Sequence, residues 1–432
     1  MYGNRNKRLL RRASGLIPLQ GADFSNRDLS GKNLTGADFT GANFTGSNIK
    51  KAVFTASILK TASVLNTANM SDTYLSEANL AGTSCMGTDF TSADMNNANL
   101  MRANLSGANL TDANLLDAIL RDSTGDLARF TSADLTTADL SGSHLHNADF
   151  TDAVMKGVEM TRADLTLATL MQADLSGAVL DHATLTNADF RQANLSAAAM
   201  DYVNTTDAQF VGASLIGAYL DFSDLLRTNF SAAILNSASI RNSNCTASRF
   251  IRAKMQSANF YQSTITDTDY TEALLNDSQF LQAVCSSTIF RKANVLRANF
   301  TRAEITECDF TEAGLADAHF TKAEVRRSKF IDAGMQGATM QGAVFSNSDF
   351  TRAVLVNADL IGSDLTGSDL TGANLRGANL TGANFGRTNL RGANLTGVQI
   401  HRTIFTGAKY NAQTKFPLTM TPAHLATMIK VP

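Results

Sequence analysis

The chain of 432 residues has a formal net charge of −2, with 44% apolar residues, no Trp and only four prolines. Its length allows two or three domains of ordinary size. No stretch is long and apolar enough to cross a membrane, and the near-balanced charge gives no reason to expect direct binding of nucleic acid.

Residues 1–20 form a basic N-terminal segment that mixes cations with large apolar residues: Arg5, Lys7, Arg8, Arg11 and Arg12, with Leu9, Leu10, Leu16, Ile17 and Leu19. The apolar run is too short for the core of a signal peptide. The segment is either a cap over the first coil of the repeats that begin at residue 21 or a flexible arm that touches an anionic membrane or nucleic acid.

Residues 21–410 repeat with a period of five. From Leu65 to Tyr410, 70 positions follow this period, and all except Gly125 and Thr205 are apolar or aromatic. A small residue, usually Ala, Ser or Thr, stands two positions before each of these central residues. A period of five fits neither a helix nor a plain strand, so the segment has a repeat architecture.

A second period of 20 lies inside the first. The central residues from Phe130 to Phe350, taken 20 apart, are aromatic at eleven of twelve places. The chain therefore returns to an equivalent place at every twentieth residue, which predicts a coil with four sides whose neighbours pair through the backbone at about 4.8 Å. We expect the central and the small residue to point inward and the other three to face water.

The unit Ala-(Asp/Asn)-(Leu/Phe)-x-x, which is cleanest from Gly372 to Leu380, resembles the pentapeptide-repeat family. The resemblance implies an all-β solenoid, a right-handed four-sided β-helix, here of about 19–20 coils with caps at its ends. The ending from Tyr410 to Pro417 is similar to that of some cyanobacterial members. Members of this family have many roles, so the resemblance by itself implies no particular biochemistry.

Three positions interrupt the repeats. Leu59 and Leu65 are separated by one residue more than the period allows, which predicts a bulge or loosened turn within residues 60–64. Gly125 and Thr205 replace large central residues, and we expect an irregular turn or a small internal void at each.

Residues 411–432 are expected to form a C-terminal cap. Thr421 and Pro422 have the sequence of a helix N-cap followed by proline at the first helical position. Residues 423–429 would then form one or two helical turns and close the last coil together with Tyr410 and Phe416.

The cysteines, histidines and motifs give no sign of catalysis. Cys85, Cys245, Cys285 and Cys308 all fall on inward positions, so we expect buried free thiols and a reducing, cytoplasmic location. His144 and His146 are close, but they lack an acidic or thiol partner pattern. Phosphate-binding, dinucleotide and hydrolase motifs are absent. We therefore expect no enzyme, no cofactor, no metal and no small-molecule substrate.

The charge is unevenly distributed. Residues 61–230 carry 21 acidic and 7 basic side chains, whereas residues 1–60 and 361–432 are basic. An acidic rod of this kind resembles the quinolone-resistance branch of the family, which imitates DNA and occupies type II topoisomerases. Ten of the 21 acidic residues, however, stand where the repeat itself takes Asp or Asn. Binding of a DNA-binding enzyme by an acidic DNA mimic is therefore the alternative function.

A series of charged outward positions, each one coil from the next, mostly alternates in sign: Arg252, Glu272, Lys292, Glu312, Asp332 and Arg352. This predicts an exposed chain of ion pairs along the coils, each worth at most about 1 kcal/mol.

Two further outward columns stand out, formed by Asp181-His182, Asp201-Tyr202 and Asp221-Phe222. We expect a column of carboxylates beside a column of aromatic rings, with Tyr219 nearby. Either these aspartates accept local backbone hydrogen bonds and the rings shield the ladder, or the two columns bind a protein.

The sequence therefore predicts a non-enzymatic, rod-like scaffold or regulator that acts through protein–protein contact. The expected partner-binding residues are Asp181, His182, Asp201, Tyr202, Tyr219, Asp221 and Phe222. The partner is a protein of unknown identity, and end-to-end pairing of two copies stays open.

Overall fold

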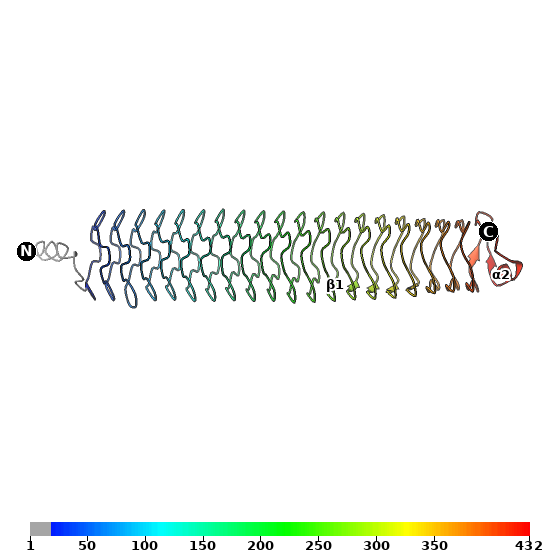
Figure 1. Ribbon diagram of the computed structural model, residues 1–432, viewed down its shortest axis with the longest axis horizontal. Helices are drawn as coiled ribbons and strands as arrows, with labels where there is room; N and C mark the ends of the chain where they lie inside the picture. Colours follow the sequence, from blue (N-terminus) through cyan, green and yellow to red (C-terminus); the bar gives the residue numbers. More distant parts are fainter. Residues whose placement is uncertain (1–18) are drawn as a thin grey trace, which may run out of the picture. The chain divides into compact units, whose positions relative to one another are not determined.

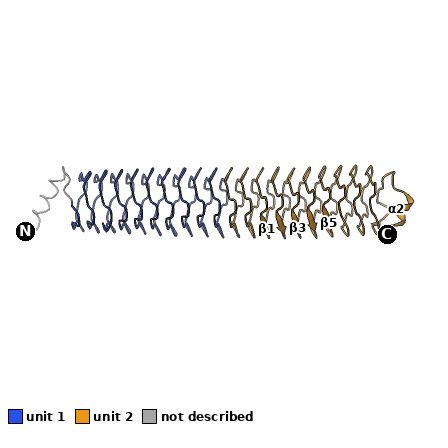
Figure 2. Cartoon of the chain, turned by 60° about the horizontal axis from the view of Figure 1, so that its bottom comes forward, with its two compact units in different colours: residues 1–214 blue, residues 215–432 orange. Residues whose placement is uncertain are grey.

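The computed structural model describes residues 19–432. The chain divides into two units, Met1–Ser214 and Leu215–Pro432 (Figure 2). Taken by itself, each unit is a stack of coils in which every twentieth residue returns to an equivalent place, which confirms the predicted β-solenoid (Figure 1). Of the basic segment predicted at residues 1–20, all but the last two residues lie outside the part that the structure describes.

One repeat consists of a short extended segment and a β-turn. In the turn after Phe130, the N–H of Ala133 donates to the Phe130 carbonyl at 3.0 Å, and Ser132 has a φ of 55°. A left-handed third residue is the mark of a type II turn. The same position has a positive φ throughout the repeats, and glycine is frequent there because it adopts this conformation without steric cost.

Neighbouring coils are joined by parallel backbone pairing. The N–H of Phe130 donates to the Asp149 carbonyl at 2.6 Å, and the N–H of Asp134 donates to the Ala113 carbonyl at 3.0 Å. In unit 1 this pairing takes the form of isolated bridges such as Asp134↔Val154.

Unit 2 contains the regular strands. A parallel sheet has the order β1 (Thr264–Thr266), β2 (Val284–Ser286), β3 (Glu304–Thr306), β4 (Glu324–Arg326) and β5 (Val344–Ser346). Each strand pairs with the equivalent strand of the next coil, as Thr264 does with Val284. Further along, β6 (Lys409–Tyr410) pairs in parallel with β7 (Ile429–Lys430).

The core consists of the central and the small residues, as predicted. Phe130, Leu135 and Ala133 have no exposed surface, and the four cysteines are buried and free. In unit 2 the ring of Tyr270 stacks between those of Phe250 and Phe290, with centroids 4.9 and 5.0 Å away. Such contacts contribute about 0.5–1.5 kcal/mol per pair beyond the burial of surface.

The extra residue within 60–64 is held in a turn with two left-handed residues. Thr61 and Ala62 have φ values of 44° and 61°, while Leu59 and Leu65 are both buried. The backbone bridges across this turn, such as Asn43↔Val64, span one residue more than those of a regular coil. The predicted loosened turn is therefore confirmed, and the coils on both sides keep their inward residues.

The irregular turn expected at Gly125 and Thr205 is contradicted, whereas the alternative of a small void stays a prediction at Thr205. The N–H of Gly125 donates to the His144 carbonyl at 2.7 Å, and the turns after both residues keep the regular hydrogen bond. The Leu145 side chain occupies the place beside Gly125, since a Cβ there would lie 2.9 Å from Leu145 Cδ2. A neighbouring coil thus supplies the volume that glycine lacks.

The helix near the C-terminus, α2, spans Pro422–Ala426, with Thr421 as its N-cap in a capping box with His424. It ends earlier than the sequence suggests, because Ile429 belongs to β7 and pairs with Lys409. The Tyr410 and Phe416 rings pack edge to face, with centroids 5.4 Å apart.

Candidate partner-binding surface

In unit 1, the aromatic residues predicted to bind a partner form a stacked pair. The rings of His182 and Tyr202 have centroids 4.9 Å apart and planes 12° apart. Tyr202 keeps 52% of its surface exposed, and His182 is also exposed. The stack arises because consecutive coils place equivalent residues directly above one another.

The carboxylate of Asp181 is engaged by the backbone. Its Oδ1 accepts a hydrogen bond from the N–H of Asp201 at 2.9 Å, and both aspartates are half-buried. This supports a structural role for Asp181, which links two turns.

In unit 2, the expectation that Asp221 lies on the surface is wrong. Its side chain is only 3% exposed. Asp221 Oδ1 accepts from the Ser239 hydroxyl at 2.7 Å and from the Arg241 N–H at 2.8 Å, and Oδ2 accepts from Arg241 Nε at 2.8 Å. The guanidinium of the next coil closes over this carboxylate and removes it from water.

The aromatic residues beside Asp221 do face solvent. Tyr219 and Phe222 are 52% and 51% exposed, and Ile216 is 45% exposed. Unit 2 therefore presents its own group of exposed apolar side chains.

Three of these rings stand on left-handed residues. His182, Tyr202 and Phe222 have φ values of 60°, 60° and 56°. The same turn position is left-handed throughout the repeats, so the fold imposes this conformation and only the exposed rings distinguish these residues.

The acidic residues of the repeat signature act as turn residues. Asp134 Oδ1, for example, accepts from the Thr136 N–H at 2.9 Å and from the Thr136 hydroxyl at 2.6 Å. Asp149 and Asp164 make the same pair of bonds with Thr151 and Thr166. Asn occupies the same place elsewhere, as at Asn109 with Thr111. The hydrogen bond, and not the charge, explains Asp at this position.

His146 has acidic partners that the sequence interpretation missed. Its Nε2 lies 3.2 Å from Asp164 Oδ2, and its Nδ1 lies 3.6 Å from Asp126 Oδ1. One aspartate comes from the coil before His146 and the other from the coil after it. Among the described residues, no three His, Cys, Asp or Glu side chains are arranged to hold a metal ion.

The ion-pair chain predicted in unit 2 is confirmed as three pairs. The distances are 2.7 Å for Arg252–Glu272, 3.7 Å for Lys292–Glu312 and 2.6 Å for Arg352–Asp332. Two further columns add one pair each, Asp277–Arg297 at 2.6 Å and Glu307–Arg327 at 2.9 Å. Most of these side chains are well exposed, so the pairs favour correct register between coils more than they add stability.

The thiols are poor nucleophiles. Burial raises the pKa of Cys308 to about 12 and moves the pKa of Cys85 further upward. A thiol needs a depressed pKa and access to solvent to react at neutral pH. These cysteines therefore serve as small core residues.

A four-sided coil, with a turn at every fifth residue and alternating large and small inward residues, defines a quadrilateral β-helix. The chain belongs to the pentapeptide-repeat family. The model of this family, described as pentapeptide repeats, matches most of the sequence, at residues 19–55, 68–107, 103–142, 128–166, 173–204, 208–244, 229–267, 278–315, 308–347, 328–367 and 368–407. The comparison with curated proteins gives no match.

Solved structures of the family resemble the chain over part of its length. HetL, a pentapeptide-repeat protein involved in heterocyst differentiation regulation in the cyanobacterium Nostoc sp. strain PCC 7120, is 23% identical over 65% of this chain and 96% of its own, with a TM-score of 0.16. Rfr23 of the cyanobacterium Cyanothece 51142 is 26% identical over 27% of this chain and 87% of its own, with a TM-score of 0.16. QnrB1, a plasmid-mediated fluoroquinolone resistance protein, is 14% identical over 52% of this chain and 89% of its own, with a TM-score of 0.20.

Within residues 19–432, no helix has the length and apolarity that crossing a membrane requires.

Proposed function

We propose that this protein is a non-enzymatic scaffold or regulator that binds a protein partner through exposed aromatic side chains. The residues are His182 and Tyr202 in unit 1, and Tyr219 and Phe222 in unit 2. The observation that carries the proposal is that these rings remain exposed, with His182 stacked on Tyr202.

The fold does not need aromatic residues here. The same turn position takes Gly, Asn or Asp elsewhere in the repeats, and each of these avoids an exposed ring. Aromatic residues are enriched among those that dominate binding at protein interfaces. Protein binding therefore gives a reason for an arrangement that the fold does not need.

The carboxylates have different roles in this proposal. Asp221 is structural, since Ser239 and Arg241 hold its buried side chain. Asp181 links two turns and, with Asp201, remains half-buried beside the His182–Tyr202 pair. These two side chains add negative charge at the edge of the aromatic pair and favour a partner with Lys or Arg next to an apolar anchor.

The alternative function, an acidic DNA mimic that binds a type II topoisomerase, is disfavoured. Aspartates of the repeat signature in unit 1 are used in turns, as with Asp134 and Thr136. Arg121 offsets another, at Asp139. We further propose a cytoplasmic location, which four buried free thiols support because a reducing compartment preserves them.

The test replaces each group of rings without disturbing the turns. Asparagine tolerates the left-handed conformation, so the variants are His182→Asn with Tyr202→Asn in unit 1, and Phe222→Asn in unit 2. Leu127→Asn is the matched control, because Leu127 is also left-handed and 67% exposed. Partners captured by the wild-type protein are identified, purified and titrated against each variant.

We expect at least one aromatic variant to lose about 2 kcal/mol or more of binding free energy, roughly a thirtyfold weaker Kd. The Leu127→Asn control should bind as the wild type does. If all variants bind the partner equally well, the aromatic side chains are not its contact residues and the proposal is wrong.

A further inference from the structure

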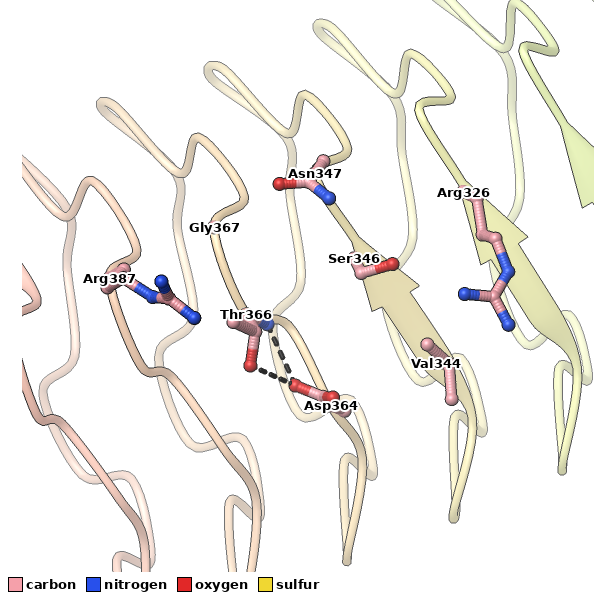
Figure 3. Close-up of a pocket in the computed structure, with 8 residues that line it drawn as sticks. All are labelled: Arg326, Val344, Ser346, Asn347, Asp364, Thr366, Gly367 and Arg387. Carbon is pink, nitrogen blue, oxygen red and sulfur yellow. Dashed lines mark hydrogen bonds between the residues drawn. The ribbon is translucent and has the colours of Figure 1, made fainter.

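A hollow of about 440 Å³ lies on unit 2, over β4, β5 and the coils after them. Arg326 and Arg387 stand at its two ends, with Ser346, Asp364 and Thr366 between them (Figure 3). The Arg387 side chain extends toward Thr366, and that of Arg326 extends toward Val344 (Figure 3). The hollow is distant in sequence from the aromatic residues proposed above and does not depend on them.

One turn in the wall of the hollow has no side chain. Gly367 is left-handed, with a φ of 75°, and stands one coil after Asn347 and one coil before Arg387. A Cβ on Gly367 would lie 2.5 Å from Asn347 Oδ1. The Asn347 side chain therefore lies against this glycine, and a side chain at residue 367 would have to displace it.

The hollow presents hydrogen-bond donors that the fold does not use. Among residues 19–432, no side chain or carbonyl pairs with the guanidinium of Arg387, the hydroxyl of Ser346 or the side-chain amide of Asn347. Arg326 donates from Nη2 to Glu324 at 2.9 Å, which leaves its other N–H groups free. Free donors of this kind fit ligands with carboxylate or carbonyl oxygens.

One acceptor lies among these donors. Asp364 Oδ1 accepts from the N–H of Thr366 at 2.9 Å and from its hydroxyl, while Oδ2 is not used by any described residue. Asp364 Oδ2 can therefore accept a hydrogen bond from a ligand N–H.

The distance between the two arginines suits a short extended chain. Arg326 and the residue before Arg387 are three coils apart, which corresponds to about 14 Å at the spacing of paired strands. An extended peptide advances about 3.4 Å per residue, so two side chains four residues apart are separated by about the same distance.

We propose that this hollow binds an extended acidic peptide segment of a partner protein. Two carboxylates four positions apart in the peptide pair with Arg326 and Arg387, and backbone carbonyls between them accept from Ser346 and Asn347. A backbone N–H of the peptide donates to Asp364 Oδ2. A nucleic-acid backbone fits less well, because it offers no N–H to donate to Asp364 Oδ2.

The experiment uses the full chain and a defined probe. The probe is a fluorophore-labelled pentapeptide of sequence Glu-Ser-Gly-Ser-Glu, blocked at its C-terminus, and its binding is measured by fluorescence anisotropy. A peptide with both Glu replaced by Gln tests the charge, and one with adjacent Glu residues tests the spacing. A labelled thymidine pentanucleotide tests the competing ligand class.

The variants are Arg387→Gln, which removes one end of the site, and Gly367→Asn, which fills the hollow with a residue that tolerates the left-handed conformation. Arg376→Gln is the matched control, because Arg376 is an exposed arginine of the same unit at a different turn. We expect Arg387→Gln and Gly367→Asn each to raise the Kd of the Glu peptide by roughly fivefold or more, in line with the loss of one exposed charge pair. The Arg376→Gln control should change this Kd by less than about twofold.

Three results would overturn the proposal. The first is an absence of binding to the wild-type chain, and the second is an equal loss in Arg387→Gln and Arg376→Gln, which indicates unspecific attraction to positive charge. The third is tighter binding of the pentanucleotide than of the Glu peptide. Thermal unfolding of each variant shows whether misfolding causes a loss.

Discussion

Arg241 reaches back to the coil before it and closes over the carboxylate of Asp221. Its backbone N–H and its Nε both donate to this side chain, each at 2.8 Å. The Asp221 side chain is 3% exposed and the Arg241 side chain is 47% exposed, so a half-exposed base covers a buried acid. Asp221 and Arg241 are one coil apart, so the period of the coil alone brings the charge and its partner together, without any sequence motif.

Replacing Arg241 with Met should destabilise unit 2. The change leaves the buried carboxylate of Asp221 with fewer donors, and hydrogen bonds to a charged group are worth about 1.5–3 kcal/mol. We expect the free energy of unfolding, measured by denaturant titration, to fall by about that amount. Arg352→Met is the control, because it breaks an exposed pair with Asp332 and should cost less than about 1 kcal/mol. Equal losses in the two variants would contradict the buried role of Asp221.

Replacing Tyr270 with Phe should stabilise the core. The Tyr270 hydroxyl is buried, and no described residue bonds to it. Its burial also raises the pKa of the phenol well above the usual range, so the group stays neutral. Removing an unsatisfied polar group while keeping the ring in its stack should raise the free energy of unfolding by about 1 kcal/mol.

Phe290→Tyr is the converse change in the neighbouring ring of the same stack. It adds a hydroxyl to a position that already fits Phe, and the denaturation midpoint should fall. A lower midpoint for Tyr270→Phe would mean that the hydroxyl has a partner, such as a buried water.

Replacing Leu127 with Gly should also stabilise the protein. Leu127 has a φ of 60° and is 67% exposed. The change to glycine therefore removes little packing and relieves an unfavourable backbone conformation. The gain should be of the order of 1 kcal/mol, because the left-handed penalty exceeds the entropic cost of glycine. Ser106→Gly, in a turn whose left-handed residue is already Gly107, should instead lose about 0.5–1 kcal/mol. A loss at Leu127 comparable to that at Ser106 would show that the leucine side chain makes a contact of its own.

The ion pairs of unit 2 should make its stability sensitive to acid. Hydrogen bonds from Arg252, Arg297 and Arg352 lower the pKa values of Glu272, Asp277 and Asp332. A carboxylate with a lowered folded pKa contributes stability above its unfolded pKa, and this contribution is lost as the pH falls through the folded value. Thermal stability should therefore decline from about pH 5 downward, because unfolded Asp and Glu titrate near pH 4.

The variant Glu272→Gln, Asp277→Asn and Asp332→Asn should have a smaller decline over the same pH range. High salt should weaken the wild-type contribution, because exposed pairs are screened. If the wild type and this triple variant lose stability in parallel on acidification, other carboxylates determine the acid response.

The sequence by itself determined the direction in which nearly every side chain points. The backbone ladder joins equivalent positions of successive four-sided coils, and a turn follows at every fifth residue. Leu135 and Ala133 must therefore both point into the core, where they are buried. The stack of His182 on Tyr202 and the pairing of Arg252 with Glu272 follow from the same count. Periodicity determines these features because each is a relation between identical positions in adjacent coils.

Only the tertiary structure decided which neighbouring side chains touch and which of them are buried. His146 meets Asp164, which is not its periodic equivalent in the next coil, because a turn residue lies beside the extended segment of that coil. The burial of Asp221, the Leu145 side chain beside Gly125 and the hollow between Arg326 and Arg387 depend on side-chain length and rotamer. A periodic sequence specifies which residues are neighbours, but the packing of side chains decides which of those neighbours touch and where space remains.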